Sequence, residues 1–178
     1  MERGKLSLFG EEISCLTIYR GWMMKPEMYS DFYILLEQKG IYLINTPEEY
    51  ERYHTLPGWY DDFADETAQS VWETEGNVEN ALLKAKQLSG SYIVKDYVKS
   101  KKHEWYDACF ISNIADVANT ASVIKNFVER QGDLLVGEIV LRKFENLKHI
   151  GFHERSGMPI SDEYRVFVYA GKVLIMDN

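Results

Sequence analysis

The chain has 178 residues, of which 46% are hydrophobic and 13% aromatic, and this composition predicts a packed domain rather than a disordered chain. Its formal net charge is −8 at pH 7, which argues against general nucleic-acid binding because such binding needs a basic face. No apolar run reaches the length of a membrane span, the N-terminus does not resemble a signal peptide, and the two cysteines form no CxxC motif. We therefore expect a cytoplasmic protein with reduced thiols and no membrane partner.

The first half of the chain alternates between strand-like and helix-like segments. Residues 14–19 read as a strand, and Pro26 stands where the first turn of a helix would begin. Gly40 ends that helix, and residues 41–44 read as a short buried strand. The segment Thr46-Pro47-Glu48-Glu49 is a capping box that starts a second helix. This order predicts an N-terminal βαβα unit of the kind found in α/β layers.

The second half changes to an α+β pattern, and the change places a domain boundary near residue 90. We expect an N-terminal α/β lobe over residues 1–90 and a second lobe over residues 91–178, in which a largely antiparallel sheet is accompanied by helices. The elements expected after residue 76 are a helix from Asn77 to Leu88, a strand over 92–98, a strand over 104–111, a helix from Asp116 to Arg130, and strands from Leu134 onward with a hairpin at Ala170-Gly171.

Three cationic side chains stand inside strands that otherwise read as buried. They are Lys95, Arg142 and Arg165, and a basic loop over residues 99–104 follows the first of them. Buried cations need partners, and together these three can bind an anion such as a polyphosphate. Two alternatives stay open: Lys95 lies on the solvated face of an edge strand, or the arginines form structural salt bridges with neighbouring glutamates.

Other side chains are weaker candidates for chemistry. Four acidic residues in the second half can contact a ribose or a hydrated Mg²⁺. They are Glu138, Glu145, Glu163 and Asp177. His149 and His153 are four residues apart, but Gly151 separates them outside a helical context, so structural histidines are favoured over a zinc site. No P-loop, GxGxxG or GxSxG motif is present. Arg20 and Trp22 follow the first strand and either line a ligand cleft or pack between the lobes.

The order of several short motifs resembles the ATP-grasp superfamily, and within it the clade named for two arginines and a lysine. The resemblance covers about residues 16–176, and it rests on the order of the motifs because each of them is short. The motifs are Arg20-Gly21-Trp22-Met23, Tyr29, Leu56-Pro57-Gly58-Trp59-Tyr60, Val94-Lys95-Asp96-Tyr97-Val98-Lys99-Ser100, Val140-Leu141-Arg142, Glu163-Tyr164-Arg165-Val166-Phe167-Val168, and Gly171-Lys172-Val173.

The resemblance implies a two-lobed protein that clamps ATP and Mg²⁺ and forms a C–N bond between a carboxylate and an amine through an acyl phosphate. It implies contacts of Lys95, Lys99 and Lys102 with the phosphates, the last two from a flexible closing loop. It implies a hinge strand, Arg142-Lys143-Phe144-Glu145, whose backbone meets adenine, with Glu145 as a ribose ligand. It also implies a catalytic Arg165 facing the phosphate or acyl group, and substrate contacts from Arg20 and Trp22. A charge-neutralising site of this kind suits phosphoryl transfer, which depends mainly on positioning.

The chain departs from the superfamily pattern at its end. The acidic residue and the Glu-x-Asn pair that supply the Mg²⁺ ligands are expected on later strands, but the sequence ends at Asp177-Asn178. The sequence therefore predicts a nucleotide lobe truncated at its C-terminus, with no identifiable metal ligands. Two functions stay open: an ATP-dependent carboxylate–amine ligase, complete or shortened, or a non-catalytic nucleotide-binding or interaction module. A second copy of the chain, in a homodimer, is a possible partner.

Overall fold

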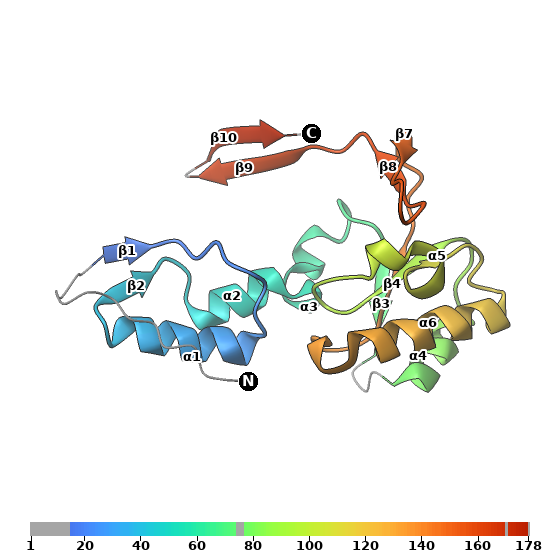
Figure 1. Cartoon of the computed structure of the whole chain (residues 1–178), viewed down its shortest axis with the longest axis horizontal. Helices are drawn as coiled ribbons and strands as arrows, with labels where there is room; N and C mark the ends of the chain where they lie inside the picture. Colours follow the sequence, from blue (N-terminus) through green and yellow to red (C-terminus); the bar gives the residue numbers. More distant parts are fainter. Residues whose placement is uncertain (1–14, 74–76, 170, 178) are drawn as a thin grey trace. The chain divides into compact units, whose positions relative to one another are not determined.

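The computed structural model describes residues 15–73, 77–169 and 171–177 (Figure 1). It has helices and mostly antiparallel sheets, which place it in the α+β class. The chain divides into two compact units, Met1–Asp61 and Asp62–Asn178, while the expected lobe boundary near residue 90 stays a prediction. Among the described residues, no helix is both long enough and apolar enough to cross a membrane.

The first unit pairs two short strands in parallel over a helix. Its elements are β1 (Cys15–Thr17), α1 (Pro26–Glu37), β2 (Ile41–Leu43), α2 (Pro47–His54) and α3 (Leu56–Trp59), with the short helix η1 (Asp61–Phe63) at the division between the units. The expected capping box is present, because Glu49 N donates to Thr46 Oγ1 and Thr46 N donates to Glu49 Oε2. Tyr29, Leu36 and Leu43 form the small core. Tyr29 also stacks on Tyr50, with ring centroids 3.8 Å apart.

The second unit contains the main sheet, whose strand order is β3-β6-β4-β5 with every pair antiparallel. Its elements are β3 (Ser70–Trp72), α4 (Val78–Ala85), β4 (Tyr92–Lys95), η2 (Lys102–Glu104), α5 (Trp105–Ala108), β5 (Phe110–Ile111), α6 (Val117–Gln131), η3 (Gly132–Leu134), β6 (Val140–Lys143), β7 (His149–Phe152), β8 (Pro159–Ser161), β9 (Arg165–Tyr169) and β10 (Lys172–Asp177). Side chains from α4 and α6 pack on one face of this sheet and make the largest core of the described chain.

Two expected strands are shorter than the sequence pattern indicates. The strand predicted over 104–111 is wrong: a single turn of helix occupies Trp105–Ala108, and only Phe110 and Ile111 form β5. Trp105 and Ala108 are both buried and three residues apart, a spacing that fits one helical face rather than alternate positions of a strand. The strand predicted over 92–98 ends at Lys95, because Asp96 begins a tight turn.

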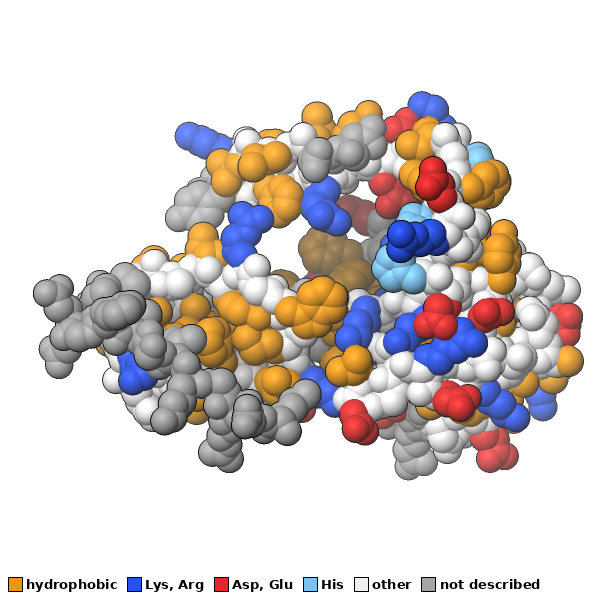
Figure 2. All heavy atoms as spheres, viewed as in Figure 1, with side chains coloured by type: hydrophobic (Ala, Val, Ile, Leu, Met, Phe, Trp, Pro, Cys, Tyr) orange, Lys and Arg blue, Asp and Glu red, His pale blue; other side chains and the backbone are white. Residues whose placement is uncertain are grey.

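Two further hairpins follow β6. β7 pairs with β8, and β9 pairs with β10, in both cases antiparallel. Gly171 has a φ of 74°, which suits the turn expected at Ala170-Gly171, although Ala170 itself lies outside the described residues. Figure 2 shows hydrophobic side chains at the surface of the β9–β10 hairpin, where Val168, Leu174 and Met176 are exposed.

Candidate functional site

The main sheet has two faces of different character, and its register assigns each residue to one of them. Directly opposed residues of an antiparallel pair project to the same face. Val94 opposes Leu141, and both lie in the core beneath α4 and α6. Ile93 opposes Arg142, and Lys95 lies two residues further along the same strand, so Lys95 and Arg142 share the other face as diagonal neighbours.

Lys95 stands on an interior strand, because β4 lies between β6 and β5. The alternative that Lys95 belongs to an edge strand is therefore wrong. Its Nζ donates to the backbone oxygen of Asp96 at 2.6 Å. The pKa of the Lys95 amine is lowered to about 8, mainly by burial; the charge of Asp96 acts in the opposite direction and raises it, while the positive charges of Arg142 and Lys102 also lower it. Three cations and one carboxylate thus act on each other at this end of the sheet.

Arg142 is fixed by the segment that leads into β3. Its guanidinium donates to Thr67 Oγ1 at 2.8 Å, to Ser70 Oγ at 3.1 Å and to the Ala68 carbonyl at 3.3 Å. These three acceptors are neutral oxygens that orient the planar fork. Arg142 is therefore held in one position on this face of the sheet.

A cleft of about 600 Å³ opens on this face of the second unit. Its volume falls in the range of small-molecule sites in proteins. Among the residues that line it are Thr67, Lys102, Trp105, Arg142, Phe144 and Glu145. Four of the residues predicted for a nucleotide site, Lys102, Arg142, Phe144 and Glu145, therefore line a single cleft. Its remaining walls include parts of β8.

One wall of the cleft is aromatic. Trp105 stacks on Phe110 with ring centroids 5.0 Å apart, and Phe144 contacts both of these rings edge-on. The N–H groups of Lys143 and Phe144 donate to the backbone of Gln69 and Ser91, so both are already used within the sheet. A planar ring entering the cleft would meet an apolar surface that is held in place by its own contacts. The pattern of residues 104–111 predicts a strand, and Trp105 was therefore not predicted to line the cleft.

The basic segment after Lys95 has polar anchors. The Asp96 carboxylate accepts hydrogen bonds from the N–H groups of Val98 and Lys99. Further along, the Glu104 carboxylate pairs with Arg130 of α6. Lys99 therefore lies in a bonded turn, and Lys102 begins η2 at the edge of the cleft. Whether this segment closes over a ligand stays a prediction.

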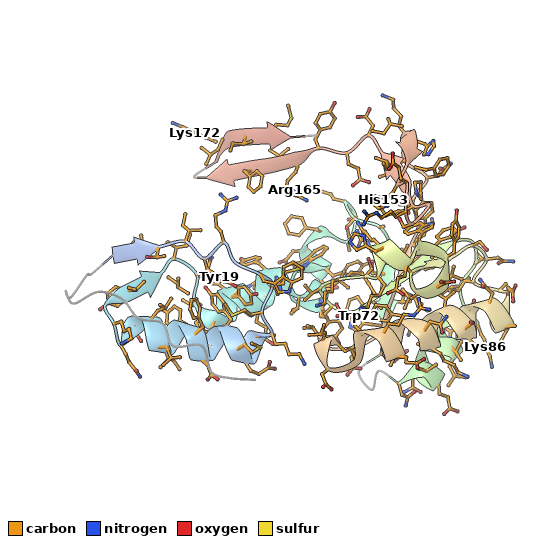
Figure 3. The ribbon with its side chains drawn as sticks, viewed as in Figure 1. Tyr19, Trp72, Lys86, His153, Arg165 and Lys172 are labelled. Atoms are coloured by element: carbon orange, nitrogen blue, oxygen red, sulfur yellow. The ribbon has the colours of Figure 1, made fainter. Side chains whose placement is uncertain are left out.

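Five predicted residues are not among those that line the cleft: Lys95, Lys99, Arg165, Arg20 and Trp22. Arg165 begins β9, two residues after Glu163, which does line the cleft (Figure 3). Arg20 and Trp22 belong to the first unit, where the Trp22 carbonyl accepts a hydrogen bond from the Tyr19 hydroxyl. Figure 3 shows Tyr19 over α1. The roles of Arg165, Arg20 and Trp22 stay predictions.

The cations that line the cleft suit a polyphosphate, whereas the described residues offer a metal ion no comparable set of ligands. In the part of the chain that the structure describes, no group of three or more His, Cys, Asp or Glu side chains is placed to hold a metal. The alternative of a zinc site at His149 and His153 therefore has no support among these residues, and His153 Nδ1 instead accepts a hydrogen bond from Ser156 N.

Comparison with known proteins identifies the family of the second unit. A family model for an ATP-grasp domain, family 3 of the clade named for two arginines and a lysine, matches residues 83–177, which is more than half of the chain. The matched segment runs from α4 to β10 and includes Lys95, Arg142 and the aromatic wall. No curated protein and no solved structure matches the chain.

Proposed function

Since the chain belongs to the ATP-grasp superfamily, in family 3 of the clade named for two arginines and a lysine, we propose that it binds ATP in the cleft of the second unit and uses it to join a carboxylate to an amine. The observation that carries the proposal is a cleft lined by Lys102, Arg142 and an aromatic wall, with the amine of Lys95 close enough to both cations for their charges to lower its pKa. The cations suit a triphosphate, and the aromatic wall suits a planar base.

In the proposed reaction, an oxygen of the substrate carboxylate attacks the γ-phosphorus of ATP, and ADP leaves with the electron pair of the broken P–O bond. The amine then attacks the carbonyl carbon of the acyl phosphate, and inorganic phosphate leaves as the amine loses a proton. Lys95 and Arg142 would neutralise charge on the phosphates, and Arg165 would face the transferred group. Lys99 would contact phosphate from the adjoining turn, and Glu145 would bind the ribose.

The superfamily resemblance also implies that the nucleotide lies between two lobes, and we include this arrangement in the proposal. Arg20 and Trp22 of the first unit would then contact the substrate. Mg²⁺ would accompany ATP as in the superfamily. The division of the lobes near residue 90 is part of the same proposal.

A thermal-shift titration tests nucleotide binding. ATP at about 100 times its Kd should stabilise the fold by roughly 2.7 kcal/mol, which corresponds to a rise in Tm of roughly 5–10 °C for a chain of this size. Lys95→Met, which keeps the aliphatic stem, should weaken this effect because a charge-assisted contact is worth about 1.5–3 kcal/mol. Lys86→Met is the matched control, since Lys86 is exposed at the end of α4 on the helix-covered side of the sheet (Figure 3). If ATP leaves the Tm of the parent protein unchanged, the proposal fails.

The second candidate is a nucleotide-binding module without turnover. It is favoured by the absence of a metal-ligand group among residues 15–73, 77–169 and 171–177. Release of ADP from ATP in the presence of Mg²⁺, with candidate carboxylates and amines, separates the two. A protein that binds ATP but releases no ADP with any of these pairs would support the module.

A further inference from the structure

We infer that Asp96 is a positioning residue whose buried carboxylate locks the turn after Lys95 to the end of α6 and thereby holds the Lys95 amine beside Arg142 and Lys102, two cations that line the cleft. The inference deepens the proposed nucleotide site and rests on it for its functional meaning. Neither Asp96 nor Lys95 is among the residues that line the cleft, but the charges of Arg142 and Lys102, which do line it, act on the Lys95 amine. Asp96 would therefore act through Lys95 rather than on the ligand.

The carboxylate of Asp96 is fully buried and accepts four hydrogen bonds. Oδ1 accepts from the N–H groups of Val98 at 2.7 Å and Lys99 at 2.6 Å, within the turn. Oδ2 accepts from Gln131 Nε2 at 2.8 Å and from Val136 N at 3.2 Å. A single side chain with 0% exposure therefore connects the turn to the last residue of α6 and to the segment that follows it.

The backbone of the same residue reinforces the connection. Asp96 N donates to the Lys99 carbonyl at 2.9 Å, and Tyr97 N donates to the Val136 carbonyl at 3.1 Å. The Asp96 carbonyl accepts from Lys95 Nζ at 2.6 Å. The Asp96 carbonyl, which accepts the hydrogen bond from the lysine amine, is thus held between two backbone N–H groups, of Asp96 and Tyr97, that are themselves hydrogen-bonded. A change in the turn would move the carbonyl and release the amine.

The four partners also explain why a carboxylate is needed. All of them are N–H donors, and an ionised carboxylate is an acceptor at both of its oxygens. Asparagine would keep one oxygen but would place an NH₂ group against two N–H groups. The charge of Asp96 acts on Lys95 as well, because it raises the pKa of the amine against the lowering caused by burial, Arg142 and Lys102.

The test compares Asp96→Asn and Gln131→Met in the full chain, by ligand binding and by NMR. Both variants should weaken ATP binding, Asp96→Asn by about ten-fold or more and Gln131→Met by less, because methionine fills a similar volume but donates no hydrogen bond. Binding of adenosine, which has no phosphate, should be unchanged in both. In a Lys95→Met background neither substitution should weaken ATP binding further, since the residue through which they act is gone.

A purely structural role predicts a different pattern. Equal losses for ATP and adenosine, or losses that add to that of Lys95→Met, would overturn the inference. If Asp96→Asn fails to fold, Gln131→Met alone tests the inference, through its affinity for ATP against adenosine and its effect in the Lys95→Met background.

A measurement without nucleotide separates this inference from the proposed function. The pKa of the Lys95 amine can be followed by NMR of ¹³C-methylated lysines, with the signal assigned by its absence in Lys95→Met. Gln131→Met should raise this pKa relative to the parent, because it keeps the charge of Asp96 but loosens the turn, so that the amine regains contact with water. Should the parent protein not bind ATP, the proposed function fails, while the positioning of Lys95 is still supported by a raised pKa in Gln131→Met and overturned by an unchanged one.

Discussion

At the scale of single residues, the burial of Lys95 favours its neutral form, whereas the proposed contact with phosphate requires its charged form. Its pKa of about 8 is low for a lysine, mainly because the amine is removed from water. A phosphate placed beside the amine would favour the charged form and raise this pKa. Nucleotide binding would then be linked to the uptake of a proton.

This linkage predicts that ATP affinity falls as the pH rises from about 7.5 to 9.5. Below the folded-state pKa of about 8 the amine is already protonated, and above it binding must include protonation of Lys95. The phosphates of ATP do not contribute to this pH dependence, because a terminal phosphate has a pKa of about 6 and stays ionised between about pH 7.5 and 9.5. Isothermal titration calorimetry in two buffers of different ionisation enthalpy measures both the affinity and the proton uptake.

Lys95→Arg is the control, since arginine stays charged at every pH in this range. It should bind ATP with an affinity that does not change between about pH 7.5 and 9.5. A parent protein with the same flat profile and no proton uptake would show that Lys95 does not contact the phosphates.

The sequence predicted the residue types of the cleft better than the contacts that hold them. Lys102, Arg142, Phe144 and Glu145 were identified as candidates, and the structure places them around one cleft, although their roles with a ligand stay predictions. The partners of Arg142 lie about seventy positions away in the chain, at Thr67, Ala68 and Ser70. Contacts at such separations depend on strand pairing, which no local pattern specifies.

At the scale of elements, local chemistry made the longer helices predictable. Asn77 and Asp116 cap α4 and α6 by accepting hydrogen bonds from the backbone N–H three residues later. The segment over 104–111 was not predictable in this way, because a single buried turn of helix and a two-residue strand are too short to show a period. The membership of β3 in the main sheet likewise depends on its distant partner β6.

Gly137 is the element-scale position where a small substitution should have the largest effect on the turn after Lys95. Its φ is +65°, and an added Cβ would lie 1.9 Å from the ring of Tyr97, which follows Asp96. Gly137→Ala should therefore lower the free energy of unfolding by more than the ~1–3 kcal/mol of backbone strain alone. Urea unfolding measures this loss.

Gly90→Ala is the matched control for that measurement. Gly90 also has a positive φ, of +92°, but an added Cβ there meets no atom within 4 Å. It should show the cost of strain without the collision. Equal losses in the two variants would mean that the Tyr97 ring moves aside at no cost.

At the scale of the whole molecule, the two units differ in how much of the proposed site they contain. The residues that line the cleft all belong to the second unit, while Arg20 and Trp22 belong to the first. If ATP is clamped between lobes, as the superfamily resemblance implies, hydrogen exchange should slow in residues 20–22 as well as around Lys95 and Arg142 when ATP is added. The physical reason is that a bound ligand stabilises the segments it contacts in both lobes, and the backbone amides of these segments then exchange more slowly.

Deuterium uptake followed by mass spectrometry, with and without ATP, measures this protection. The peptides over α4 and α6, which cover the opposite face of the sheet, serve as the internal reference. Protection confined to the second unit would contradict the two-lobed clamp and leave nucleotide binding to residues 62–178.

The anchoring of Arg142 has a consequence for inheritance. The family match begins at residue 83, yet the oxygens that orient this arginine come from residues 67–70, and the edge strand β3 follows directly at Ser70–Trp72. A gene segment exchanged or duplicated at the limits of the match would carry the arginine without its supports. The structural support of Arg142 therefore extends beyond the matched segment, and we expect substitutions at Thr67 and Ser70 to accompany substitutions at Arg142.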